Sequence, residues 1–121
     1  MTAYKFGDVV LVPFPFTDQT ITKQRPAVVI SNAAYHHQAR LDVILLAVTS
    51  QLRPVLGIGE AIVQEWKGAG LLKPSVLKPV ITTIEQRLII KTLGRLQEAN
   101  RSALERVIAT VIGGSARTLA L

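Results

Sequence analysis

Arg25 is the residue of this sequence whose type and position best suit chemistry on an anion. It stands where a polar connection, residues 15–24, meets the apolar stretch 26–31. Arginine is permanently charged, and its planar fork of donors matches the geometry of phosphate oxygens. A guanidinium fixed at a strand start beside a polar loop therefore fits an anion or nucleic-acid site. An ordinary hairpin with a solvated arginine gives the same local pattern.

The tripeptide Thr49-Ser50-Gln51 is a second polar group in a suitable place, because it ends the apolar stretch 42–49. If this stretch is a buried strand, the hydroxyl groups emerge at the rim of the sheet. They can meet a ligand there, or they can only cap the turn that follows, as serine and threonine often do. The sequence leaves both roles open.

Charged and polar residues in two other places can reach the same rim. Lys73 and Lys78 follow a glycine-containing stretch, and either side chain can reach the rim or remain solvated. Asp18, Lys23 and Gln24 belong to the polar connection, and Asp18 can meet a ligand there. Such connections commonly run over the surface and carry binding residues.

Other residues that could carry chemistry are few. The chain has no cysteine, which excludes disulfides, thiolate metal sites and cysteine nucleophiles. His36 and His37 are adjacent, and neighbouring side chains diverge on a helix or a strand, so they suit an exposed loop better than a metal site. Asp8 follows a glycine and is expected to support a turn. We expect solvated surface carboxylates at Glu60, Glu65 and Glu85.

The elements that must position these residues are mostly short strands separated by turn residues. Residues 26–31 and 42–49 are continuously apolar, which suits strands buried on both faces. Pro13 and Pro15 end the first strand or place it at an edge. The expected strands are residues 6–14, 26–31, 42–49, 59–63, 75–82 and 88–91, with a glycine turn at 68–70 and a loop or single helical turn within 32–40.

One segment near the C-terminus has a helical period instead. Its apolar residues follow the i, i+3, i+4, i+7 spacing of a single helix face; they are Leu104, Val107, Ile108 and Val111. Asn100 or Ser102 can cap the start, and the glycines at 113 and 114 can end the helix. The pattern predicts a mainly β fold, a barrel or curled sheet with a C-terminal helix packed on it.

Composition bounds the class of protein. At 121 residues and 49% hydrophobic content, the sequence suits one globular domain with a real core, and no apolar run reaches the ~18 residues of a membrane span. The N-terminus lacks the features of a secretory signal, so we expect a cytosolic protein. The net charge of +6 and the pI near 10.2 favour a polyanionic partner or an acidic protein.

Five segments in chain order carry a family resemblance. They are GDVVLV at 7–12, RPAVVIS at 25–31, TSQ at 49–51, GLLKPSVL at 70–77 and LGRL at 93–96. Each segment is weak alone, but their order and spacing together resemble the MazF/PemK family, the toxins of bacterial toxin–antitoxin pairs.

The resemblance implies a fold, an activity and partners. The fold would be a single-domain SH3-like barrel of the MazF/PemK/CcdB type, with residues 1–114 as the toxin domain and 115–121 as a tail. The activity would be metal-independent, sequence-specific cleavage of single-stranded RNA, which arrests growth, with no cofactor. The partners would be a second copy of the chain and a cognate antitoxin that lays a flexible acidic segment across the RNA groove.

Carried over residue by residue, Arg25 corresponds to the catalytic arginine of the family and Thr49 to its catalytic threonine or serine. Arg25 would bridge two phosphate oxygens, and Thr49 would hydrogen-bond one of them. Arginine is a poor general base because its pKa exceeds about 12. The residues expected to bind RNA are Asp18, Lys23, Gln24, Ser50, Gln51, Lys73 and Lys78.

One departure from the family leaves alternatives open. Some relatives carry an arginine-x-aspartate pair on the strand after the glycine turn, whereas residues 76–82 have Lys78 and no aspartate. The general base is therefore unassigned, and a relative that binds antitoxin without cleaving RNA is an alternative. Other proteins of this fold poison DNA gyrase through a tryptophan-containing tail. The single tryptophan here is Trp66, and the tail has no aromatic residue, which argues against that activity.

Overall fold

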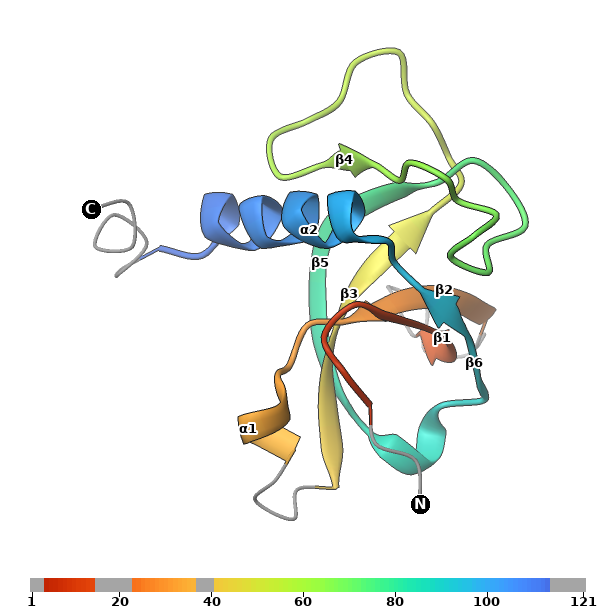
Figure 1. Cartoon of the computed structure of the whole chain (residues 1–121), viewed down its shortest axis with the longest axis vertical. Helices are drawn as coiled ribbons and strands as arrows, with labels where there is room; N and C mark the ends of the chain where they lie inside the picture. The colour runs from red at the N-terminus through yellow and green to blue at the C-terminus, as the bar shows by residue number, and fades with distance from the viewer. Residues whose placement is uncertain (1–3, 15–22, 37–40, 114–121) are drawn as a thin grey trace.

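Apolar runs of alternating and continuous type build one antiparallel sheet in the computed structural model, which describes residues 4–14, 23–36 and 41–113 (Figure 1). In this described part the sheet has six strands in the order β4-β5-β3-β2-β1-β6. The strands are β1 Asp8–Phe14, β2 Lys23–Val29, β3 Asp42–Thr49, β4 Ala61–Ile62, β5 Val76–Glu85 and β6 Lys91–Arg95. The helices are α1 Ala33–His36 and α2 Glu98–Val111, with a 3₁₀ turn η1 at Gln86–Leu88.

The central strands are buried on both faces, as their continuous apolar runs predict. Alternate residues of β2 and β3 belong to two different apolar clusters. Val28 and Leu46 pack in the cluster that α2 covers, whereas Ala27 and Leu45 pack in the second cluster. Because side chains alternate along a strand, burial of both faces requires layers on both sides of the sheet. The sheet therefore curls, and the expectation of a mainly β fold with a C-terminal helix is confirmed.

The C-terminal helix packs through the expected face but begins earlier than expected. Leu104 and Val107 are buried against the sheet, which confirms the apolar stripe. The helix starts at Glu98, after Gln97, so the predicted caps Asn100 and Ser102 are wrong. Asn100 is only 1% exposed and binds the loop before β5 instead of capping its own helix.

The buried amide of Asn100 fixes the position of α2 on the sheet. Its Oδ1 accepts a hydrogen bond from the backbone N–H of Gln64 at 2.8 Å, and its Nδ2 donates to the carbonyl oxygen of the same residue. A side-chain amide can satisfy a backbone N–H and C=O together in this way. The helix ends at Val111, just before Gly113, which agrees with the expected end. Gly114 lies outside the described residues.

The last strand also differs from the expectation of residues 88–91. Residues Gln86–Leu88 form the 3₁₀ turn, and β6 begins only at Lys91. The strand is placed by pairing with β1, from Leu11 opposite Lys91 to Asp8 opposite Arg95. This long-range pairing overrides the strand propensity of residues 88–90. Two other strands are shorter than expected: β4 covers only Ala61–Ile62 of the expected 59–63, and β1 covers only Asp8–Phe14 of the expected 6–14. The strand expected at 75–82 is longer and ends at Glu85.

Two glycines let the expected turn at 68–70 pack directly on β6. A Cβ atom on Gly70 would lie 2.0 Å from the carbonyl oxygen of Leu93, and one on Gly94 would lie 2.5 Å from that of Ala69. Gly70 also has a φ of +87°, which favours glycine. The close approach brings residues 71–73 beside β6 (Figure 1).

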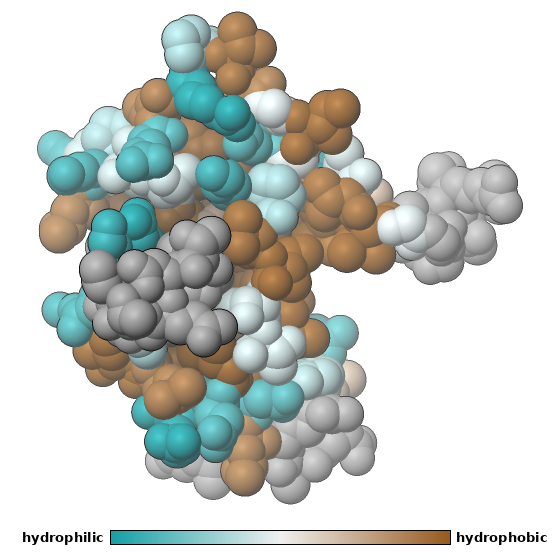
Figure 2. Space-filling model, turned by 180° about the vertical axis from the view of Figure 1, so that it is seen from behind, coloured by the Kyte–Doolittle hydropathy of each residue, from teal (hydrophilic) through white to brown (hydrophobic). Residues whose placement is uncertain are grey.

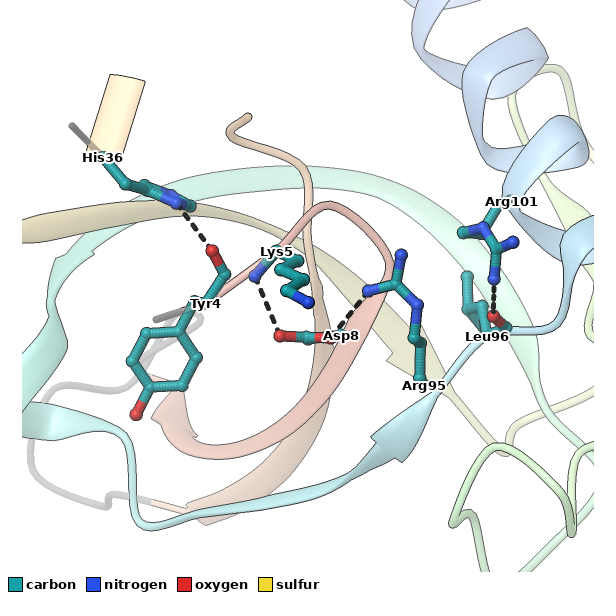
Figure 3. A network of polar contacts seen from close by, with 7 residues as sticks. All are labelled: Tyr4, Lys5, Asp8, His36, Arg95, Leu96 and Arg101. Atoms are coloured by element: carbon teal, nitrogen blue, oxygen red, sulfur yellow. Dashed lines mark hydrogen bonds and ion pairs between the residues drawn. The ribbon is translucent and has the colours of Figure 1, made fainter. Parts of the chain in front are cut away.

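Polar contacts near the start of β1 connect residues at the ends of several strands and helices (Figure 3). The carboxylate of Asp8 accepts the backbone N–H of Lys5 at 2.8 Å and pairs with Arg95 at 3.0 Å, so its expected role in a turn is confirmed. Arg101 of α2 donates to the carbonyl oxygen of Leu96 at 2.6 Å.

In the part of the chain that the structure describes, no helix is long and apolar enough to cross a membrane.

Candidate nucleic-acid interface

A fork between β2 and β3 places Arg25 and Thr49 on either side of an opening. The two strands pair from Val29 opposite Leu45 to Ala27 opposite Ala47, and their pairing ends there. Continuing that register would set Arg25 opposite Thr49. Pro26 has no N–H to extend the ladder. Beyond it, β2 keeps its pairing with β1 and β3 keeps its pairing with β5, but the two strands no longer pair with each other. The strands therefore part where the two candidate catalytic residues stand.

A bulge in β5 brings Lys78 to the same opening. Leu46 pairs with Ile81 and Val48 with Leu77, so the single residue Ala47 faces the three residues 78–80 of β5. Pro79, in the middle of the three, cannot donate to the ladder. Bulges of this kind re-aim side chains and are common beside functional sites. Lys78 is accordingly exposed and lines a hollow next to Arg25.

The smaller of two hollows at the fork is lined by side chains that could act on a phosphate group. Its volume is about 280 Å³, and its polar lining consists of Arg25, Thr49, Gln51 and Lys78. The Thr49 hydroxyl oxygen accepts a hydrogen bond from the backbone N–H of Gln51 at 3.1 Å. The turn-capping role is therefore real. It uses one lone pair and leaves the hydroxyl hydrogen able to donate to a ligand.

The larger hollow lies on the other side of the β3 end. Its volume is about 510 Å³, and Arg25 lines it as well as the smaller one. Successive residues of a strand point to opposite faces. The tripeptide is accordingly divided, with Thr49 and Gln51 at the smaller hollow and Ser50 at the larger one. The polar residues of the larger hollow are Gln24, Arg25, Ser50, Lys73, Ser75 and Lys91.

Sequence reasoning missed Lys91. The pattern of residues 88–91 predicts a strand but gives this lysine no role, because no local feature distinguishes it. Its place at the hollow follows from the pairing of β6 with β1, in which Lys91 stands opposite Leu11. Such pairing between distant segments is the kind of information that periodicity alone does not carry.

Both hollows are lined by positive charge. Their cations are Arg25, Lys73, Lys78 and Lys91, and no aspartate or glutamate of the described residues lines either one. Opposed carboxylates would otherwise neutralise the field that attracts an anion. Within the same described ranges, no three His, Asp or Glu side chains gather closely enough to hold a metal ion.

Glu60 interacts electrostatically with Lys78, and its side chain is mostly buried, which corrects the expectation of a solvated surface carboxylate. Its side chain is 8% exposed and forms a 2.6 Å ion pair with Arg53. The N–H of Gly57, which donates to the carboxylate at 2.7 Å, holds the pKa of Glu60 below its ordinary value of 4.5. Burial opposes this effect, whereas Arg53 and more weakly Lys78 lower the pKa further. Glu60 thus ties down the loop between β3 and β4.

Other candidates lie away from the hollows or outside the described residues. Lys23 is exposed at the first position of β2 but lines neither hollow. Asp18 and the other residues of 15–22 lie outside the described residues. Glu65 is exposed, and Glu85 is 53% exposed beside Arg87, so the expectation of surface carboxylates is confirmed for both.

His36 has a structural role that the sequence did not show. It ends α1 and is partly buried, which corrects the expectation of an exposed loop pair. Its Nδ1 lies 2.8 Å from the carbonyl oxygen of Tyr4 (Figure 3), and its Nε2 lies 2.7 Å from the Ser31 hydroxyl. A carbonyl oxygen only accepts, so Nδ1 carries a proton. His37 lies outside the described residues.

Comparison with known proteins supports a single family. The sequence profile of PemK-like, MazF-like toxins of type II toxin–antitoxin systems matches residues 5–112. A search of the curated proteins finds no significant match. Solved structures with a similar fold include an endoribonuclease in complex with its cognate antitoxin from a mycobacterial species, with a TM-score of 0.70, 18% identity, and coverage of 89% of this chain and 93% of that one.

Two further structures have the same fold. The Mycobacterium tuberculosis toxin MazF-mt6 has a TM-score of 0.65 and 19% identity, over 84% of this chain and 92% of that one. MazF from Deinococcus radiodurans has a TM-score of 0.69 and 18% identity, over 94% and 99%. Identities this low establish a shared fold, whereas the profile match covers nearly the whole described chain. The chain therefore belongs to the PemK-like, MazF-like toxin family of type II toxin–antitoxin systems.

Proposed function

We propose that this chain is the toxin of a toxin–antitoxin pair and that it cleaves single-stranded RNA, sequence-specifically and without a metal ion. The observation that carries the proposal is the fork between β2 and β3, where Arg25 and Thr49 line one hollow whose charged lining is cationic. The guanidinium of Arg25 carries several N–H donors in one plane, and the Thr49 hydroxyl lines the same hollow. Together these donors suit the oxygens of one phosphate group.

The chemistry needs few groups because RNA carries its own nucleophile. The 2′-hydroxyl oxygen forms a bond to the adjacent phosphorus, and the bond from phosphorus to the 5′-oxygen breaks. The products are a 2′,3′-cyclic phosphate and a free 5′-hydroxyl; the 2′-oxygen loses one proton and the 5′-oxygen gains one. The protein must hold the reacting atoms in line and stabilise the charge that grows on the phosphorane oxygens.

Each polar residue of the smaller hollow has a role in the proposed reaction. The Arg25 guanidinium bridges two phosphorane oxygens, and Thr49 donates its hydroxyl hydrogen to one of them while the N–H of Gln51 holds its oxygen. Lys78 adds positive charge to the same hollow. Arg25 can also supply a proton to the leaving oxygen, but a guanidinium has no free acceptor site and does not act as the base. The base is left unassigned.

The proposed partners follow from the same cationic surface. A cognate antitoxin with a flexible acidic segment would bind across the hollows and compete with RNA. The net charge of +6 suits either partner, and a mycobacterial endoribonuclease of the same fold was crystallised with its antitoxin.

We further propose a homodimer, with residues 1–114 as the toxin domain and 115–121 as a tail. Figure 2 shows apolar side chains gathered at the C-terminal end of α2, where Ile112 is 51% exposed.

A gyrase poison of this fold has no support from the structure. Trp66 lies in the turn before β5, is partly buried and packs against the main apolar cluster. Lys67 lies over its ring, with Nζ 5.5 Å from the ring centroid. This tryptophan is therefore part of the fold and does not resemble the tail tryptophan on which gyrase binding depends.

The proposal is tested by cleavage in vitro. Purified protein is incubated with a mixed-sequence RNA in the presence of EDTA, and both ends of each product are mapped. We expect cuts at a recurrent sequence, with 2′,3′-cyclic phosphate and 5′-hydroxyl ends. Arg25→Ala, purified in the same way, controls for contaminating nuclease. Lack of cleavage over a broad substrate panel would contradict the proposal and favour a relative that only binds antitoxin.

A further inference from the structure

The larger hollow contains a cation that the proposed reaction does not use. Lys91 begins β6, and Lys73 follows the turn at 68–70, yet both line this hollow. They come together because Gly70 and Gly94 allow the turn and β6 to touch at distances that any side chain would prevent. The fold thus brings two lysines from distant segments to one cavity.

Among the described residues, neither lysine has an acidic partner that would explain its position. Both side chains are exposed, and in the described ranges neither forms an ion pair with a carboxylate. Arg25 adds a third positive charge to the same lining. Like charges that gather without an acidic neighbour repel one another, and a bound anion removes that repulsion.

The rest of the lining suits the other part of a nucleotide. The walls include the apolar side chains Leu11, Pro26 and Leu71, together with the polar groups of Gln24 and Ser50. Apolar walls with a few placed polar groups are typical of small-molecule sites. A nucleotide has base faces for such walls, base edges for the amide and hydroxyl, and a phosphate for the lysines.

We propose that the larger hollow is a subsite for the nucleotide next to the cleaved bond, and that Lys73 and Lys91 hold the phosphate of that nucleotide. The proposal rests on the proposed function, because Arg25 lines both hollows and is the group assigned to the cleaved phosphate. A chain whose phosphate sits at Arg25 reaches the larger hollow with its adjacent nucleotide. Lys91 is then a binding residue and takes no part in the chemical step.

The test separates binding from chemistry with two measurements. The first is the affinity for a fluorescent mixed-sequence single-stranded oligonucleotide with 2′-deoxy sugars, which cannot be cleaved, at several salt concentrations. The second is the kinetics of cleavage of an RNA that contains a mapped cut site. Both are made on the wild type, Lys91→Ala and Lys73→Ala, with Lys67→Ala as the matched control because Lys67 is exposed and lines neither hollow.

We expect each subsite variant to weaken oligonucleotide binding about five-fold and to lower the slope of log K against log salt by about 1, as loss of one phosphate contact does. For RNA, KM should rise by a similar factor while kcat stays within about two-fold, which is the mark of lost uniform binding. Lys67→Ala should match the wild type in every measurement. Unchanged melting temperatures would show that the variants fold.

The outcomes distinguish this proposal from the proposed function. If RNA is cleaved and Lys91→Ala behaves like Lys67→Ala, the subsite is wrong and the nuclease stands. If the oligonucleotide binds with the expected dependence on both lysines but RNA is not cleaved, phosphate binding by Lys73 and Lys91 is supported, whereas the nuclease, and with it the assignment to a cleaved bond, fails. A drop in kcat without a change in KM for Lys91→Ala would also overturn the binding role.

Discussion

The fork around Arg25 and the polar network around Asp8 use the same kinds of side chain in different ways. In the network, Asp8 pairs with Arg95 and His36 contacts Tyr4 (Figure 3). The other ring nitrogen of His36 contacts Ser31. Donors there meet acceptors of the same molecule. At the fork, Arg25 shares its two hollows with three lysines and no carboxylate of the described residues. Ion pairs and hydrogen bonds within the molecule hold a fold together, whereas cations gathered without a carboxylate create a site for an external anion.

The comparison predicts that substitutions at the fork change activity. Substitutions of side chains whose polar groups bind other parts of the chain, here called the framework, should change stability instead. A variant that changed both would break this distinction.

Arg25→Ala should lower kcat by about 10²–10³-fold, the usual cost of one group that stabilises transition-state charge. Arg25→Lys should recover only part of this loss, because a lysine is a point charge without the planar fork. The measurement is single-turnover cleavage of a mapped RNA, with thermal unfolding alongside. A large drop in melting temperature for Arg25→Ala would instead assign the arginine to the framework.

Asn100→Ala should destabilise the fold by about 2–3 kcal/mol, because it leaves the backbone N–H and C=O of Gln64 without the amide that satisfies them. Cleavage per folded molecule should be unchanged. Denaturant unfolding measures the loss, and Glu98→Ala, at the exposed start of the same helix, is the control. Equal stability of the two variants would show that the buried amide does not fix α2.

Thr49→Val should lower kcat about tenfold, in keeping with the loss of one donor to a charged oxygen. Thr49→Ser should retain activity, since it keeps the hydroxyl. Cleavage kinetics of the two variants provide the measurement. If the threonine serves only to accept the N–H of Gln51, both variants should cleave like the wild type, and the valine variant should lose only stability.

Glu60→Gln should show a small, pH-dependent loss of stability. The pKa of Glu60 is lower in the folded protein than its ordinary value of 4.5, so its ionised form stabilises the fold above that pH. This contribution disappears as the pH falls through the lowered pKa. The melting temperatures of the variant and the wild type should therefore differ at pH 7 and converge as the pH falls through that lowered pKa. A constant difference across this range would contradict the role assigned to Glu60.

Much of the fold could be read from local pattern. Residues 42–49 are a strand with the expected bounds, because a continuous apolar run has few other stable solutions. The apolar face of α2 followed from its period. The helix start did not, since Asn100 is a good cap in isolation but is engaged by Gln64 in the folded protein. The strand expected at 88–91 failed for a related reason, because pairing with β1 placed it later.

The candidate site was predictable to a similar degree. Arg25 and Thr49 followed from the order of family segments along the chain, and the structure sets them beside one hollow. The division of Thr49 from Ser50 depends on how β3 ends, and the place of Lys91 depends on register between distant strands. His36 has a donor and an acceptor role that only its neighbours in space reveal.

By itself the sequence determined the family, the basic charge, the buried strands and the two residues with the clearest chemistry, because these depend on composition, period and order. The tertiary structure decided which of those residues meet. A proline that cannot extend a ladder opens the fork at Arg25, a bulge re-aims Lys78, and two glycines bring Lys73 and Lys91 to one hollow. These juxtapositions depend on contacts between distant segments, which no local pattern encodes.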